Sequence, residues 1–314
     1  MVKMYNTDID TNVTSETKVF QRGNWINMIN PTKEEIELIC EAVNIEPDFI
    51  HYALDAEEKA RIDIEDDKIL FIIDVPVSEE ENGNIVYTTM PVGLIFVRDE
   101  YLITVSLREN GLITKMEQLV KRSLATYKKS QFLFQVFYEN ASMFLNMLKI
   151  INKKTELLEK TLKKSLKNED LMKMLNIEKS LVYFTTSLKS NEIVMEKTLR
   201  GKIIKLYEED EDLLEDSIIE NKQAMEVSKT YSDILNETMD VYASVISNNI
   251  NDVMKFLTSI TIILAVPTLI ASIWGMNVPV PLQSNQYGFV ILIVASIIIT
   301  LLTMILFKKK DMLR

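Results

Sequence analysis

The chain has 314 residues, of which 47% are apolar and 26% charged, and its formal net charge is −11. Such an acidic chain lacks the basic footprint that nucleic-acid-binding proteins need, so no nucleic-acid partner is expected. The single cysteine, Cys40, excludes disulfides within the chain and CxxC sites, and the single histidine, His51, excludes multi-histidine metal sites. There is no GxGxxG or GxxxxGK[ST] motif, so no organic cofactor is expected either.

Residues 1–110 carry signals for both strands and helices. Short β-branched and aromatic runs predict strands at Trp25–Ile29, Ile69–Val75, Ile85–Thr89, Val92–Val97 and Tyr101–Ser106. A helical pattern opens at Pro31, and its apolar face is formed by Ile36, Ile39, Cys40 and Val43. Elements in this order favour an α/β sandwich, so residues 1–110 are expected to form a cytoplasmic α/β domain.

The following part of the chain is almost free of helix breakers, with no proline between Pro91 and Pro267. Helical periodicity over Phe132–Leu166 and Leu171–Leu199 predicts a helical bundle in residues 111–207. Residues 208–274 are expected to form one long stalk helix that continues into an apolar span. Sixty residues of helix extend roughly 90 Å, so this helix must pack against its neighbours or against copies of itself.

Near the C-terminus, 52 consecutive residues, Phe256–Phe307, contain no acidic or basic side chain. They divide into spans at 256–274 and 287–307, separated by a loop at 275–286 that contains glycine and two prolines. Each span is long enough to cross a bilayer once, which predicts a two-helix transmembrane hairpin in contact with lipid. The alternative is a hairpin buried in a soluble core.

Basic residues flank the hairpin on one side only, at Lys255 and in the tail 308–314. The positive-inside rule then places both termini in the cytoplasm and the loop outside. We therefore expect a multi-pass protein of the cell membrane, that is, the plasma or inner membrane.

A mostly polar or small stripe runs along the predicted stalk helix and its apolar span. Its members follow one another at intervals of three and four residues: Asp240, Ser244, Ser247, Asn251, Met254, Thr258, Thr261, Ala265 and Thr268. Polar groups inside a bilayer face protein or water, so several copies of the chain around an axis would place this stripe along an aqueous path. Small and hydroxyl residues also pack helices together without any pore, and periodicity leaves both interpretations open.

The stalk helix begins with an acidic run, in which eight of thirteen residues between Glu208 and Glu220 are Asp or Glu. Carboxylates are suitable ligands for Mg²⁺ or Ca²⁺. Acids are also favoured at a helix N-terminus, and a solvated acidic face is the common structural explanation of such a run.

At the end of the first span, the motif Trp274-Gly275-Met276-Asn277 is followed by a short loop and a second span. Together with the layout of the whole chain and the segment Asn251–Thr258, this motif resembles the signature of the CorA family of divalent metal-ion (Mg²⁺/Co²⁺) transport proteins. The resemblance implies a funnel-shaped homopentamer, in which each subunit contributes an α/β domain, a stalk helix that lines the pore and an outer second span.

The resemblance also assigns roles to individual residues. Gly275, Met276 and Asn277 would form the outer selectivity filter. The pore-facing positions would be Asp240, Asn251, Met254, Leu257 and Thr268, together with Thr261 from the stripe. Met254 and Leu257 would act as a hydrophobic gate. Asp216 would bind a regulatory divalent ion together with an acid of the neighbouring subunit, for which Asp55, Glu57 and Glu58 are the candidates.

These expectations describe a channel rather than an enzyme. The favoured function is Mg²⁺ uptake driven by the membrane potential, with Mg²⁺ as both the transported and the regulatory ion and Co²⁺ or Ni²⁺ as further candidates for transport. The first alternative is a transporter of Zn²⁺ that resembles the ZntB group. The second is a membrane-anchored scaffold or sensor, which predicts no ion flux, and the third is a membrane-tethered enzyme.

Overall fold

The computed structural model describes residues 1–81, 84–98, 100–162, 168–201, 203–204, 207–283 and 285–312. Residues 163–166 of the predicted helix Phe132–Leu166 therefore lie outside the described residues, as do the side chains of Glu208 and Glu209 in the acidic run. The chain divides into two compact units, Met1–Asn236 and Glu237–Arg314.

The first unit is built on one seven-stranded sheet with the strand order β2-β1-β3-β7-β6-β5-β4. Neighbouring strands are antiparallel, except that β3 and β7 run parallel, with Ile26 opposite Ile103. The strands are β1 (Val2–Thr7), β2 (Thr14–Thr17), β3 (Trp25–Ile29), β4 (Arg61–Glu65), β5 (Lys68–Glu81), β6 (Asn84–Val97) and β7 (Tyr101–Ser106).

The strands predicted at Trp25–Ile29 and Tyr101–Ser106 are confirmed with the same bounds. The prediction of two strands at Ile85–Thr89 and Val92–Val97 was wrong, because both belong to the single strand β6. Pro91 lies immediately before Val92, which is the first β6 residue that pairs with β7. Proline is tolerated at an open strand edge, where no neighbouring strand needs its missing N–H group.

Asparagine side chains satisfy the backbone of β5 where β4 no longer covers it. The last β5 residue paired with β4 is Ile72, and Asp74 lies two positions further. The Asp74 N–H group donates to Asn191 Oδ1 (2.9 Å), and the Asp74 carbonyl accepts from Asn191 Nδ2 (2.8 Å) and Asn140 Nδ2 (2.9 Å). Two helix side chains thus replace the missing strand, which avoids the cost of leaving buried backbone groups unpaired.

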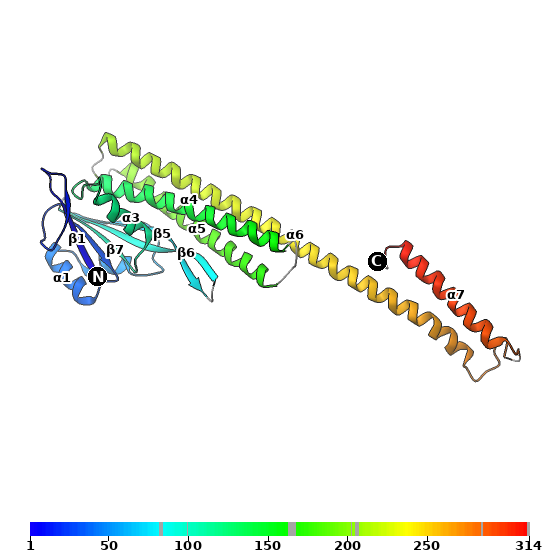
Figure 1. Cartoon of the computed structure of the whole chain (residues 1–314). Helices are drawn as coiled ribbons and strands as arrows, with labels where there is room; N and C mark the ends of the chain where they lie inside the picture. The colour runs from blue at the N-terminus through cyan, green and yellow to red at the C-terminus, as the bar shows by residue number, and fades with distance from the viewer. Residues whose placement is uncertain are drawn as a thin grey trace. The chain divides into compact units, whose positions relative to one another are not determined.

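Helices cover both faces of the sheet, as expected for an α/β sandwich (Figure 1). On one face lie α1 (Lys33–Val43) and α2 (Pro47–Ala53), and the predicted apolar face of α1 is buried there. A capping box between Thr32 and Glu35 fixes the start of α1. The other face is covered by α3 (Gly111–Val120), α4 (Lys129–Leu162) and α5 (Asn168–Gly201), with the first turns of α6 contributing Leu214 and Ile218.

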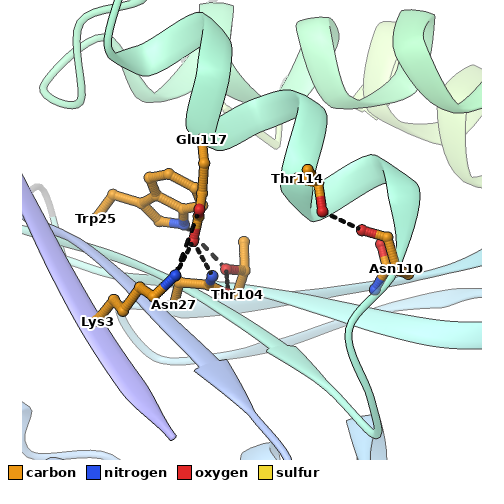
Figure 2. Close-up of polar contacts among 7 residues, drawn as sticks. All are labelled: Lys3, Trp25, Asn27, Thr104, Asn110, Thr114 and Glu117. Carbon is orange, nitrogen blue, oxygen red and sulfur yellow. Dashed lines mark hydrogen bonds and ion pairs between the residues drawn. The ribbon is translucent and has the colours of Figure 1, made fainter.

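A buried polar cluster ties α3 to the centre of the sheet (Figure 2). Glu117 on α3 accepts hydrogen bonds from Lys3 Nζ on β1 and Asn27 Nδ2 on β3, each at 3.2 Å. Asn27 Oδ1 accepts from the Thr104 hydroxyl, which in turn accepts from Trp25 Nε1 at 2.9 Å. The polar groups beside the fully buried Trp25 ring are therefore paired, as burial in a core requires.

Within the first unit, α6 pairs with α5 through short polar side chains. Asn221 Nδ2 donates to the Leu188 carbonyl (2.9 Å), and the Ser228 hydroxyl donates to the Leu181 carbonyl (3.1 Å). These bonds join side chains of one helix to the backbone of the other, so they fix the alignment of the two helices along their length.

The long helix expected after residue 208 is observed as α6 (Glu208–Trp274), which contains Pro267. The second unit holds its C-terminal part, a connecting loop, and α7 (Gly288–Lys309). Both helices are long and apolar enough to cross a membrane. These two candidate spans agree with the hairpin expected from the charge-free stretch, and their surface is almost entirely exposed, unlike that of a hairpin buried in a soluble core.

Candidate functional site

The stripe predicted on the stalk helix is uncovered in the second unit. Each of its nine members, from Asp240 to Thr268, is exposed, and 54% of the surface of Met254 is accessible to solvent. The stripe therefore does not serve to pack α6 against the rest of its own unit. A surface of hydroxyl, amide and small side chains on an apolar helix is open to another partner or to water.

The opposite side of α6 is the one that the same unit covers. The less exposed positions in this part of α6 include Ser259, Ile263, Val266 and Ile270. At 100° per residue, the face that these four residues share lies about 150° around the helix from the stripe. The partly covered positions of α7, namely Leu292, Ser296, Thr300, Thr303 and Phe307, also form one face. We infer that these two faces meet, which leaves the stripe pointing away from α7.

Met312, which follows α7, accepts a hydrogen bond from the covered face of α6. The Ser259 hydroxyl donates to the Met312 carbonyl at 3.1 Å, and Ser259 is fully buried. Asp311 adopts a left-handed conformation (φ 51°), which turns the chain back after α7. The sequence pattern gave no sign of this contact, because a serine in an apolar span is equally compatible with the stripe or with the packed side.

Two hollows lie along α6. The one nearer the loop, of about 610 Å³, includes the stripe residues Thr261, Ala265 and Thr268 and continues to Ser272. The other, of about 560 Å³, includes Asn251, Met254 and Thr258, together with Asn248, Asp252, Lys255 and Met312. Ser272 and Asn248 were not among the predicted site residues. Continuing the stripe by four residues beyond Thr268 would have found Ser272.

Leu257, the second predicted gate residue, is also exposed (56%) but lies to one side of the stripe. By helix geometry, it is about 60° from the centre of the Thr258–Thr268 portion. Met254 lies on the stripe itself. The two side chains therefore belong to adjacent faces of α6, and both are available to a neighbouring helix.

The Gly275-Met276-Asn277 motif lies where α6 ends. The Gly275 N–H group still donates to the Ala271 carbonyl at 3.0 Å, as in an α-helix. The Met276 N–H group donates to the Ile273 carbonyl at 3.4 Å, which is the spacing of a tighter turn. Asn277 is exposed, and its side chain makes no hydrogen bond to any other described residue. The amide is therefore free to contact a ligand in front of the end of the helix.

The loop after this motif makes contacts within itself and with the end of α6. Ser284 lies outside the described residues. Trp274 Nε1 donates to the Pro281 carbonyl at 3.2 Å, which returns the loop to the end of α6. At Gly288, the first residue of α7, a Cβ atom would lie 2.5 Å from the Leu282 carbonyl oxygen, so only glycine fits this approach. These contacts limit the positions that Asn277 can take.

The four candidate ligands of a regulatory ion are on the surface of the first unit. Asp216, Asp55 and Glu57 are exposed, whereas the Glu58 carboxylate already pairs with Arg61. Among the described residues, no group of three or more metal-ligating side chains comes together within one chain. Within the described residues of one chain, Asp216 therefore belongs to no such group.

The comparisons with known proteins cover nearly the whole chain. Residues 20–309 match the model of the family described as CorA-like Mg²⁺ transporter protein. The cobalt/magnesium transport protein CorA of Methanocaldococcus jannaschii is 27% identical over 290 residues, which cover 91% of this chain and 90% of the relative. The magnesium transport protein CorA of Helicobacter pylori strain J99 is 24% identical over 92% of this chain and 90% of its own length.

Solved structures show the same fold. The complete structure of the CorA magnesium transporter from M. jannaschii superimposes with a TM-score of 0.85 at 25% identity and covers 98% of this chain and 97% of its own. The ZntB cytoplasmic domain from Vibrio parahaemolyticus covers 78% of this chain and 98% of its own with a TM-score of 0.63, but at 10% identity this likeness shows the fold alone. The chain belongs to the CorA family of divalent-cation transporters.

Proposed function

We propose that the chain assembles as a homopentamer whose five α6 helices surround an aqueous pore and conduct Mg²⁺ into the cell. The observation that carries this proposal is the exposed polar stripe on the side of α6 away from α7. A helix that meets lipid on that side would be expected to carry apolar residues there, and the side that meets its own hairpin partner is a different one. Asp240, Asn251, Met254, Thr261 and Thr268 then line the path.

Gly275, Met276 and Asn277 form the selectivity filter in this proposal. Mg²⁺ releases its water ligands reluctantly and prefers octahedral oxygen coordination. A ring of Asn277 amide oxygens accepts hydrogen bonds from those waters, so the ion is recognised while still hydrated. The loop carries no carboxylate. Neutral oxygens bind the ion less tightly than charged ones, and conduction needs release as well as entry.

Met254 and Leu257 form the hydrophobic gate at the opposite end of the span. When five copies bring these side chains together, the path becomes too narrow and too apolar to hold water, and a hydrated ion cannot pass. Because Met254 and Leu257 lie on neighbouring faces of α6, a modest rotation of the helix changes which of the two side chains points toward the pore axis. The gate can thus respond to a change in the position of the helix.

The ion enters with the membrane potential. Both termini are cytoplasmic in this arrangement, and the loop with Asn277 faces outward, since Lys255 and the basic tail flank the hairpin on one side. The potential contributes about 2.3 kcal/mol per charge for each 100 mV, and twice that for a divalent ion. No further energy source is needed for uptake.

Mg²⁺ inside the cell closes the channel in this proposal. Asp216 of one subunit and Asp55 or Glu57 of its neighbour supply carboxylate oxygens, which suit Mg²⁺, whereas Glu58 is held by Arg61. An ion bound in this way stabilises whichever pore state brings the carboxylates together. Without the ion, repulsion between the acidic subunits favours the other state.

A cysteine-accessibility experiment tests the pore directly. In a Cys40→Ser background, Ala265→Cys places a thiol on the stripe, and the matched control Ala271→Cys places one on α6 about 100° from the stripe. We expect a charged, membrane-impermeant thiol reagent to block Mg²⁺ flux into proteoliposomes through Ala265→Cys and to leave Ala271→Cys unaffected. Equal block of both variants, or of neither, contradicts a pore lined by the stripe.

Competition between ions in the same assay identifies the cargo. The proposal predicts that Mg²⁺ is carried and that Co²⁺ and Ni²⁺ compete for entry. Preferential Zn²⁺ flux would favour the ZntB-like alternative, although the stripe offers neither cysteine nor histidine to that softer ion.

A further inference from the structure

A small pocket lies in the first unit, away from the residues proposed for transport. It has a volume of about 220 Å³ and lies between β6 and the ends of α4 and α5 that face each other. Its lining is Ile85, Tyr87, Lys154, Leu158, Lys173, Asn176, Ile177 and Ser180. The pocket thus combines two ammonium groups with polar and apolar walls.

The floor of the pocket is buried and hydrogen-bonded. Tyr87, Ile177 and Ser180 are buried, and the Tyr87 N–H group donates to the Ser180 hydroxyl at 3.3 Å. The Ser180 hydroxyl also donates to the Asn176 carbonyl at 2.9 Å, so strand β6 is joined to α5 directly beneath the pocket. A preformed floor lowers the entropic cost of binding a ligand.

The two lysines differ in how their charges are balanced. Lys173 pairs with Asp170 at 3.1 Å. Lys154 Nζ instead lies 4.8 Å from the centre of the Tyr87 ring, and none of the described carboxylates forms an ion pair with it. An aromatic ring attracts a cation but does not cancel its charge. The pocket therefore holds an uncompensated positive charge.

The sequence around the pocket also carries an excess of positive charge. Residues 149–179 contain nine lysines and five acidic residues, a net charge of +4 in a chain whose formal net charge is −11. Three of these lysines, at positions 163, 164 and 167, lie outside the described residues. An excess of positive charge in the sequence around the two pocket lysines favours anions over cations. It also repels divalent cations, so the pocket is unsuited to the ion that the channel carries.

We propose that this pocket binds a phosphate group that is esterified to a small organic moiety. Lysine is a point-charge donor that suits phosphate oxygens, and the Asn176 amide adds donors in the same wall. Ile85 and Leu158 provide apolar contact for the carbon part of the ester. The volume lies below the roughly 300–1,000 Å³ of pockets for drug-sized ligands, which restricts the ligand to a small phosphate ester or a lipid headgroup.

The test uses the full-length chain in an uncharged detergent and glycerol 3-phosphate as the soluble probe. We expect a saturable rise in the thermal unfolding midpoint that sodium chloride at equal ionic strength does not reproduce. Lys154→Met should weaken the apparent Kd about tenfold or more, since it removes a charged hydrogen bond, whereas Lys154→Arg should retain binding. The matched control is Lys153→Met, which removes the same charge from the exposed neighbouring position.

A second arm separates the two sources of phosphate. The same midpoints are measured in vesicles of pure phosphatidylcholine and in vesicles of equimolar phosphatidylglycerol and phosphatidylcholine. Stabilisation by phosphatidylglycerol that depends on Lys154 identifies a lipid headgroup, and a response to glycerol 3-phosphate alone identifies a soluble ester. The proposal is overturned if neither probe raises the midpoint, or if Lys153→Met and Lys154→Met lose the response equally. The unliganded midpoint of each variant shows whether it is folded.

Discussion

Replacement of Asp74 by asparagine should stabilise the first unit at neutral pH. Burial raises the pKa of Asp74 from its ordinary value of 3.8 to about 6, and a hydrogen bond from Ser187 offsets only part of this effect. The side chains of Asn140 and Asn191 bond the Asp74 backbone, which limits how far the residue can shift toward water. Asparagine has nearly the same shape and keeps an oxygen that accepts a hydrogen bond from Ser187.

The magnitude follows from the shift in pKa. The folded state binds the Asp74 proton more tightly than the unfolded state, so the free energy of unfolding falls as pH rises between about pH 4 and pH 6. The shift from 3.8 to about 6 corresponds to a total loss of roughly 3 kcal/mol. The asparagine of Asp74→Asn does not titrate, so the advantage of this variant over the wild type should grow by about 2 kcal/mol between pH 4 and pH 8.

The assay needs a signal from the first unit alone. The chain contains two tryptophans, Trp25 and Trp274, and Trp25 is buried in the core of that unit. In a Trp274→Phe background, urea unfolding of the full-length chain in detergent is followed by Trp25 fluorescence at several pH values, with and without Asp74→Asn. A difference in unfolding free energy between these two proteins that stays the same at every pH would refute the reasoning, because all other titrating groups contribute equally to both.

Two further predictions concern transport. Asn277→Ala should lower selective Mg²⁺ uptake about tenfold or more while the oligomer stays intact, because it removes the amide oxygens that bind the hydrated ion, and wild-type flux in this variant would reject the filter. Asp216→Ala should raise the internal Mg²⁺ concentration needed for closure by roughly fivefold or more without abolishing uptake, as expected when a coupling site loses a ligand. Asp212→Ala, an equal change of charge at an exposed position one turn earlier, is its control, and equal inhibition of both variants and the wild type would contradict the regulatory site.

The structure confirms the elements whose evidence was local. The strands Trp25–Ile29 and Tyr101–Ser106 and the buried face of α1 follow from side-chain patterns within a single element. The short strands β1, β2 and β4 were not predicted, because they are partly exposed and rich in polar residues, and the alternation in β4 extends over only five residues. The segments Ile85–Thr89 and Val92–Val97 join into one strand because β6 continues through Pro91, where β7 no longer lies alongside.

The candidate site was also predictable only in part. The stripe from Asp240 to Thr268 could be found because helical periodicity is a property of the chain itself. Its exposure could not be predicted, since hydroxyl and small residues are equally suited to packing against another helix. The contact between Ser259 and Met312, which marks the covered side of α6, joins residues that are 53 positions apart.

The amino-acid sequence by itself determined the positions of the two apolar spans, the long helix without breakers and the CorA motif at its end. These features depend on hydropathy, periodicity and helix-breaking residues, all of which act over a few neighbouring positions. Only the tertiary structure decided that Asn140 and Asn191 complete the edge of β5, that the stripe is left uncovered, and that Lys154 lies over Tyr87 in a pocket. Such contacts join residues from distant parts of the chain, and their energies depend on packing that no local pattern specifies.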